Sequence, residues 1–341
     1  MLETIWFVLW GLLWAIYFAL DGYDLGIGML LPFLGKDHDE RRVMINAMGP
    51  FWDGNEVWLI TAGGVTFAAF PGTYATMFSS LYTPLMLILF ALIFRGISFE
   101  FRGKVDHPSW IKLWDTCLTI GSFIPALLFG VAFANIFAGL PLDRDGMLHG
   151  NLLTLLNPYG LVGGVLFVLL FLVHGSLMLG IMSEGSIHRR ARKAMRVLWP
   201  ILLGVAIYFL IATYFATPLY ENYFRHPWLF VIPLAAVVGL IQIRMKADRE
   251  SLWPSFAASA VTILSTTLFG VAGIYPNLLP SSLDPVASRT AFNTSSSPLT
   301  LKIMLAVALI TIPAVIAYQT WVHVKFSTKT RLADLIDGES Y

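Results

Sequence analysis

Residues 161–182 read LVGGVLFVLLFLVHGSLMLGIM and contain no Asp, Glu, Lys or Arg. A helix of about 20 apolar residues is long enough to cross the hydrocarbon core of a bilayer, so this stretch predicts a transmembrane helix. Eight further stretches meet the same criterion. The nine expected spans cover residues 5–34, 52–71, 77–98, 114–139, 154–182, 197–217, 228–243, 253–275 and 299–323.

The composition of the whole chain agrees with a membrane protein. Of its 341 residues, 57% are hydrophobic and only 13% are charged, whereas about a quarter of the residues in a soluble domain are charged. The net charge of +1 provides no basic field for nucleic acid. A single cysteine, Cys117, excludes an intrachain disulfide framework and a cysteine-based metal site. The sequence therefore predicts an all-α integral membrane protein with about nine transmembrane helices.

Lys and Arg side chains are concentrated in alternate loops. The first, third, fifth and seventh loops and the tail hold Lys36, Arg41, Arg42, Arg102, Lys104, Lys112, Arg189, Arg190, Arg192, Lys193, Arg196, Arg244, Lys246, Arg249, Lys325, Lys329 and Arg331. The other loops hold only Arg144, Arg225 and Arg289. Because cytoplasmic loops carry the excess of Lys and Arg, we expect the N-terminus outside, the C-terminus in the cytoplasm and an odd number of spans.

A short internal repeat suggests how the spans are grouped. Phe129–Ala132 (FGVA), near the end of span four, recurs as Phe269–Ala272 near the end of span eight. Repeats of four helices share one orientation, which favours two four-helix bundles plus a peripheral helix. The expected units are residues 1–150, residues 151–276, and residues 277–341 with the ninth span and the tail.

Acidic side chains and one arginine gather in the cytoplasmic half of the first four spans. They are Asp21 and Asp24 in span one, Asp53 and Glu56 in span two, Arg95 and Glu100 at the end of span three, and Asp115 at the start of span four. Charges in hydrocarbon are costly and usually mark a functional path. One interpretation is a set of buried ion pairs that join Arg95 to Asp53 or Asp24. The other is a proton-uptake path, because one arginine cannot neutralise four carboxylates, and the surplus acids must be hydrated or protonated.

The sequence offers few ligands for a redox centre. Haem iron needs axial His, Met, Cys or Tyr, and of seven histidines only His174 lies well inside a span; we expect it to be a hydrogen-bonded bundle residue. We therefore expect no haem, metal or catalytic site in this chain. Trp6, Trp10 and Trp14 recur every four residues on one face of span one. They could form a wall for a quinone ring or a partner helix, or an interfacial anchor at Trp6 with packing below it.

Several motifs together resemble one known family. They are DGYDLGIGML at 21–30, WDGNEVWLITAGG at 52–64, FAAFP at 67–71, FRGISFEFR at 94–102, the segment 114–135, and LNPYGL at 156–161. With these motifs the chain resembles subunit II of the bacterial cytochrome bd-type quinol oxidases over its whole length. The family's acidic, basic and tryptophan positions in the membrane correspond to Asp21, Asp24, Trp52, Asp53 and Arg95. We group Trp52 with the three tryptophans of span one as a quinone or partner contact.

The resemblance implies a function for the complex and a role for this chain. It implies a heterodimer in the bacterial inner membrane in which subunit I holds haems b and d and the quinol site. The complex would reduce dioxygen to water with quinol electrons and generate a proton-motive force. This chain would stabilise subunit I and contribute a proton route toward the haems. Some members hold a structural quinone, and small single-span subunits are further possible partners.

Two alternative functions remain open from the sequence. A proton-coupled secondary transporter would use paired carboxylates to bind its coupling ion, but transporters usually interrupt corresponding helices near mid-membrane. The glycine-rich stretches at 22–28 and 63–64 have no clear counterparts in spans five and six. A purely scaffolding subunit would need Asp21, Asp24 and Asp53 for assembly alone.

Overall fold

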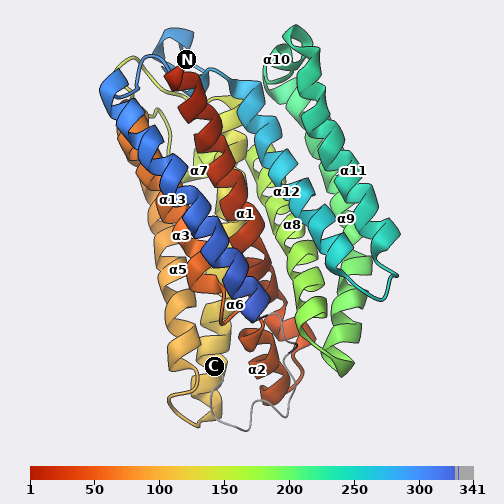
Figure 1. Cartoon of the computed structure of the whole chain (residues 1–341). Coiled ribbons are helices and arrows are strands. Elements are labelled where there is room, and N and C mark those ends of the chain that lie inside the picture. The colour runs from red at the N-terminus through yellow and green to blue at the C-terminus, as the bar shows by residue number, and fades with distance from the viewer. Residues whose placement is uncertain (327–328, 330–341) are drawn as a thin grey trace.

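Long helices make up most of the structure, a computed structural model that describes residues 1–326 and 329 (Figure 1). The long helices are α1 (Leu2–Leu34), α3 (Trp52–Ala69), α5 (Tyr82–Phe101), α6 (Pro108–Ala138), α8 (Pro158–Met182), α9 (Gly185–Ala216), α11 (Val231–Lys246), α12 (Trp253–Ile274) and α13 (Pro298–Lys325). The shorter elements are α2 (His38–Asn46), α4 (Pro71–Ser80), α7 (Leu152–Leu155), α10 (Tyr220–Arg225), η1 (Pro227–Phe230), η2 (Pro285–Ala287), and the antiparallel strands β1 (Asn277–Leu279) and β2 (Arg289–Thr290). Residues 327, 328 and 330–341 of the predicted tail, which include Arg331, lie outside the described residues.

The prediction of an all-α membrane fold is confirmed. Within the described residues, eight helices are long and apolar enough to cross a membrane. The predicted span at 52–71 corresponds to α3, which is not one of these eight. Its 18 residues include Asp53, Asn55 and Glu56 in its first turns, and these side chains lower its hydropathy. The exact number of spans stays a prediction.

Two predicted boundaries differ from the structure for physical reasons. The expected span at 77–98 is divided at Leu81 into α4 and α5. Pro84 lacks an N–H and its ring clashes with the carbonyl four residues earlier, so the helix that begins at Pro71 ends at Ser80. The expected span at 197–217 begins earlier, at Gly185, because its basic first part is also helical.

Helix α1 forms the centre of the fold and contacts α3, α6, α8 and α12 (Figure 1). Its backbone approaches that of α8 closely at two glycines. A Cβ at Gly26 would lie 1.9 Å from the carbonyl oxygen of Phe171, and one at Gly175 would lie 2.6 Å from the carbonyl carbon of Gly26. Such small-residue contacts hold membrane helices together. His174 Nε2 bonds the Ala19 carbonyl at 2.9 Å across the same interface, which confirms the prediction for this histidine.

Helix α13 crosses the front of the bundle against α1 and α3 (Figure 1). Of its described residues only Leu301 is buried, and Trp6 Nε1 donates to the Leu301 carbonyl at 3.1 Å. The last turns of α13 and α2 lie at one end of the molecule, which we call the α2 end, and the N-terminus and α10 lie at the other (Figure 1). Helix α13 is thus a peripheral element that reaches from one end to the other.

Glu40 of α2 connects this short helix to α9. Its carboxylate forms an ion pair with Arg190 Nη2 at 2.5 Å. It also accepts hydrogen bonds from Ser186 Oγ at 2.8 Å and from the Lys36 backbone N–H at 2.8 Å. Burial alone would raise the pKa of Glu40, but the Arg190 guanidinium and the hydrogen bonds from the Lys36 N–H and Ser186 outweigh it and lower the pKa from 4.5 to about 2. The ionised carboxylate therefore stabilises the folded state.

This lowered pKa predicts a pH-dependent stability. Because the folded pKa lies below the unfolded value, the stabilisation is complete above pH 4.5 and is lost as the pH falls toward 2. We expect Glu40→Gln to reduce the free energy of unfolding at pH 7 by about 1–3 kcal/mol and to flatten this acid dependence. Thermal unfolding of the purified complex at several pH values measures both effects. The exposed Glu221→Gln is the control, and an unchanged melting temperature for Glu40→Gln would contradict the prediction.

Candidate functional site

Arg95 of α5 joins three helices through buried ion pairs. Its Nη2 donates to Asp21 Oδ1 of α1 at 3.0 Å, and neither side chain is exposed. Its Nη1 donates to Glu56 Oε1 of α3, whose side chain is 21% exposed. We call Asp21, Glu56 and Arg95, together with Asp24, the Arg95 cluster. Two carboxylates thus share one guanidinium inside the helix bundle.

The predicted partners of Arg95 were wrong. The sequence suggested Asp53 or Asp24, whereas the structure pairs Arg95 with Asp21 and Glu56. Residues three positions apart on a helix differ by about 60° in direction. This difference turns Glu56 toward Arg95 and leaves Asp53 exposed at the start of α3. It likewise turns Asp21 toward α5 and Asp24 toward α3.

Close packing fixes the position of the Arg95 side chain. A Cβ at Gly121 of α6 would lie 2.9 Å from Arg95 Cβ, so the two backbones approach closely there. Arg95 Cζ lies 5.9 Å from the centroid of the Phe99 ring, a cation–π distance. Trp52 stacks on the same Phe99 ring, with 4.8 Å between the Trp52 and Phe99 centroids and 6° between the planes. Trp52 therefore lies next to the Arg95 cluster through Phe99, and its quinone or partner contact stays a prediction.

Asp24 has a different environment, which sequence reasoning missed. Its Oδ2 accepts a hydrogen bond from Asn55 Nδ2 at 2.7 Å, and Asn55 Nδ2 also donates to the Tyr23 hydroxyl at 2.7 Å. Both Asp24 and Asn55 are buried. Among the described residues, Asp24 Oδ1 has no hydrogen-bond partner. Asn55 lies within the motif WDGNEVW, between the two acids of α3, but an analysis of charges alone does not single out an amide.

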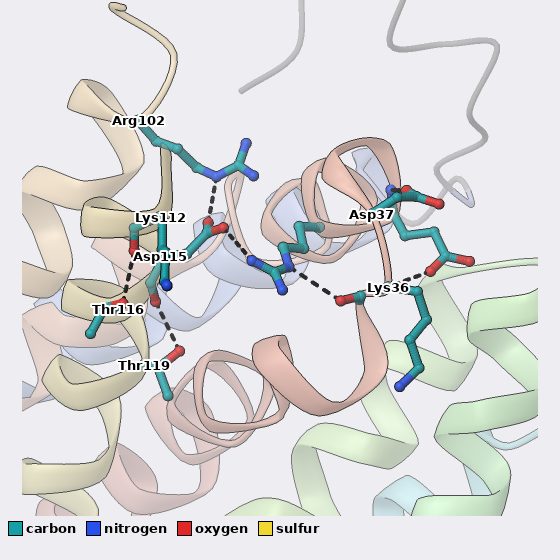
Figure 2. Close-up of polar contacts among 10 residues, drawn as sticks. Lys36, Asp37, Arg102, Lys112, Asp115, Thr116 and Thr119 are labelled. Carbon is teal, nitrogen blue, oxygen red and sulfur yellow. Dashed lines mark hydrogen bonds and ion pairs between the residues drawn. The ribbon is translucent and has the colours of Figure 1, made fainter. Parts of the chain in front are cut away.

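Asp115 belongs to a different ion-pair cluster, in which it contacts Arg102 (Figure 2). Its Oδ2 accepts from Arg41 Nη1 at 2.8 Å, and its Oδ1 accepts from Arg102 Nε at 2.6 Å. It precedes Gly121, the residue beside Arg95, by six positions, which is about 9 Å along α6. Asp115 therefore forms an ion-pair cluster of its own at the α2 end and is not part of the Arg95 cluster.

The two remaining predicted acids lie on the surface of the chain. Asp53 is exposed at the first turn of α3, and Glu100 is exposed at the end of α5. Glu100 lines a cavity of about 750 Å³ at the α2 end together with Arg42, Arg102 and Lys104. The structure thus places Asp53 and Glu100 outside the buried cluster but at the same end of the molecule.

The tryptophans of α1 pack within this chain. Trp6, Trp10 and Trp14 are 2%, 1% and 6% exposed. Trp10 Nε1 donates to Thr66 Oγ1 at 3.0 Å, and Trp14 packs edge-on against Phe133 with 5.4 Å between the centroids. Packing, one of the two alternatives considered, accounts for their contacts. A quinone or partner contact for them stays a prediction.

Comparison with known proteins assigns the chain. The family model described as cytochrome bd terminal oxidase subunit II matches residues 2–326. The chain belongs to this family. It is 37% identical over 332 residues to the cytochrome bd ubiquinol oxidase subunit 2 of Bacillus subtilis (strain 168), covering 95% of this chain and 96% of that relative. It is 35% identical over 367 residues to the cytochrome bd-I ubiquinol oxidase subunit 2 of Escherichia coli (strain K12), covering 98% and 96%.

A solved structure shows the same fold. The bd oxidase from Geobacillus thermodenitrificans contains a chain that superposes with a TM-score of 0.74 at 17% sequence identity, covering 95% of this chain and 98% of that one. As a cytochrome bd subunit II, the chain is a multi-pass inner-membrane subunit of an oxidoreductase complex, a terminal quinol oxidase, and has a partner subunit. Within residues 1–326 and 329, no group of three or more His, Cys, Asp or Glu side chains could hold a metal ion.

Proposed function

We propose that this cytochrome bd subunit II contributes a proton-uptake path from the cytoplasm toward the haems of its partner subunit, and that it stabilises that partner. The supporting observation is the Arg95 cluster. Three carboxylates, Asp21, Asp24 and Glu56, lie around one guanidinium inside the bundle. Since charge in a membrane interior must be balanced, the surplus carboxylate is suited to bind and release a proton.

The distribution of basic side chains supports a cytoplasmic location for the α2 end. Arg41, Arg102 and Arg190 all lie there and form ion pairs with Asp115 or Glu40. Because Lys and Arg mark cytoplasmic loops, we place the α2 end and the C-terminus in the cytoplasm and the N-terminus outside. In this orientation a path from the α2 end to the Arg95 cluster begins in the cytoplasm.

The exposures of the acids suggest an order for the path. Glu100 lies in the cavity at the α2 end, Glu56 is partly exposed, and Asp21 is fully buried. A proton taken up at the first two groups could reach the third through the carboxylates that share Arg95. Asp53, exposed on α3 at the same end, is a further acid that could accept protons.

This arrangement gives the subunit a role in energy conservation. Reduction of dioxygen to water consumes protons, and oxidation of quinol releases them. We infer that haems b and d and the quinol site lie in subunit I. If protons are taken from the cytoplasm and released outside, turnover generates a membrane potential without a pump. The carboxylates of this chain would supply the uptake half of that process.

Purification of the native complex tests the assignment of function. We expect the chain to co-purify with a haem-bearing partner, with the absorption of haems b and d, and with quinol oxidase activity. Oxygen consumption with a soluble quinol and the optical spectrum are the measurements. A colourless preparation without a partner would contradict the proposal and favour a proton-coupled transporter.

A further inference from the structure

A chain of hydrogen bonds connects the end of α13 to Asp24. His323 Nε2 lies 3.2 Å from the Tyr23 hydroxyl of α1. The same hydroxyl accepts from Asn55 Nδ2 at 2.7 Å, and Asn55 Nδ2 also donates to Asp24 at 2.7 Å. Tyr23, Asn55 and Asp24 are buried, whereas His323 is partly exposed at the α2 end. This series of hydrogen bonds therefore runs from the surface of the molecule to a carboxylate in its interior.

The direction of each hydrogen bond can be deduced from one backbone carbonyl. His323 Nδ1 lies 2.8 Å from the Gln319 carbonyl oxygen, which can only accept, so Nδ1 carries a proton. In the neutral ring Nε2 is then the acceptor, and the Tyr23 O–H donates to it. The Tyr23 oxygen accepts from the Asn55 amide, which also donates to Asp24. In this state the phenolic proton of Tyr23 points outward, toward His323.

The His323 ring is held in place by one stacking contact and by the hydrogen bonds of its two nitrogens. It stacks on Phe51, with 4.5 Å between the ring centroids and 20° between the planes. Tyr23 faces it from α1, and Gln319 and Lys325 are its neighbours along α13. Stacking and two hydrogen bonds thus orient the ring so that Nε2 faces Tyr23.

We propose that His323 takes up protons at the cytoplasmic end of α13 and passes them through Tyr23 to Asp24, with Asn55 holding Tyr23 and Asp24 in place. The inference rests on the proposed proton-uptake function, and it names a point of uptake separate from Glu100 and Glu56. Histidine is suited to this task because one ring nitrogen can accept a proton while the other keeps its hydrogen bond to the Gln319 carbonyl.

The transfer balances in protons and involves no electrons. A proton adds to His323 Nε2, and the new N–H turns the hydrogen bond around so that it donates to the Tyr23 oxygen. As that proton moves to the oxygen, the phenolic proton leaves toward the Asp24 carboxylate. His323 and Tyr23 return to their neutral forms, and Asp24 has gained one proton. Tyr23 and Asp24 bond the same Asn55 nitrogen, so their oxygens are at most twice 2.7 Å apart, which is short enough for one water molecule to bridge.

The test uses the intact purified complex with saturating quinol. We expect His323→Ala to slow oxygen consumption roughly tenfold while the haem spectrum is retained, because a positioned proton-transfer group contributes at least this much. Added imidazole, which replaces the missing base, is expected to restore part of the rate. Tyr23→Phe is expected to be slow as well and not to respond to imidazole. His323→Gln, which can hydrogen-bond but cannot carry the proton, serves if the alanine variant does not assemble, and it is expected to be slow.

Two controls separate proton transfer from attachment of α13. The Gln319 side chain joins α13 to α3 through Trp58 Nε1 at 2.9 Å and the Gly54 carbonyl at 2.6 Å. Gln319→Leu removes these bonds and keeps the backbone carbonyl that orients His323. His107→Ala removes a histidine from the same end of the molecule. Both variants are expected to stay within about twofold of the parent rate.

The outcomes decide between the inference and its rivals. If His323→Ala or His323→Gln consumes oxygen at the parent rate, the proposed transfer through His323 is overturned. It is also overturned if His323→Ala lowers the rate and imidazole does not restore it, because a histidine that only attaches α13 would give this result. If Asp24→Asn is slow and the His323 variants are not, the transfer through His323 fails and the proposed uptake path stands. If Asp24→Asn also turns over normally, both proposals fail.

Discussion

Replacing Arg95 with glutamine is expected to prevent stable assembly of the complex. The substitution leaves the Asp21 and Glu56 carboxylates inside the bundle without their cation. Removing one partner of a buried ion pair costs about 3–5 kcal/mol because the other charge stays buried, and here two pairs are lost at once. This cost is a large part of the total stability of a typical protein. The amount of this chain and of haem in isolated membranes measures the effect.

Two further variants show that buried charge is the cause. Arg102→Gln leaves Asp115 with its second arginine, Arg41, at 2.8 Å, so we expect a much smaller loss of assembly. Combining Arg95→Gln with Asp21→Asn and Glu56→Gln removes the stranded charges, and we expect assembly to recover. Full assembly of the single Arg95 variant with the parent melting temperature would show that the cluster does not stabilise the chain.

The membrane fold could be predicted because the length of an apolar segment is read directly from the sequence. In a bilayer, residues 161–182 must form a helix to satisfy their own backbone hydrogen bonds, and α8 contains all of them. The division at Leu81 was predictable in principle from Pro84, but hydropathy averages over such a residue. The polar first turns of α3 lower its hydropathy, yet α3 is a helix that packs against α1, as the span at 52–71 predicts.

The composition of the site was predicted better than its connections. Asp21, Asp24, Glu56 and Arg95 do lie close together, because spacing and depth along each helix are read from the sequence. Which carboxylate contacts Arg95 depends on the rotation of each helix about its axis, and a difference of about 60° decides it. His323 could not have been found in this way. It lies 300 residues from Tyr23 in the chain, and only tertiary packing brings α13 to α1.

The proton-uptake path and a purely scaffolding role make opposite predictions for Asp24. Asparagine has nearly the same shape as aspartate, and its carbonyl oxygen can still accept the hydrogen bond from Asn55 that Asp24 accepts at 2.7 Å. Asp24→Asn should therefore keep the packing of α1 against α3 and remove only the ability to carry a proton. A scaffold would be unaffected in turnover once it had assembled.

We expect complexes with Asp24→Asn to assemble, to show the parent haem spectrum and to reduce oxygen at least about tenfold more slowly, as the loss of a proton-transfer group predicts. Asp53→Asn, on the exposed face of α3, is expected to slow turnover in the same assay. Asp39→Asn is a matched control, because Asp39 is an exposed acid of α2 at the same end of the molecule. The slow step should be proton delivery, so electrons should still reach the haems at the parent rate in a stopped-flow experiment with quinol. If the Asp24 and Asp53 variants both assemble fully and turn over like the parent, these carboxylates carry no protons for oxygen reduction and their burial serves the architecture alone.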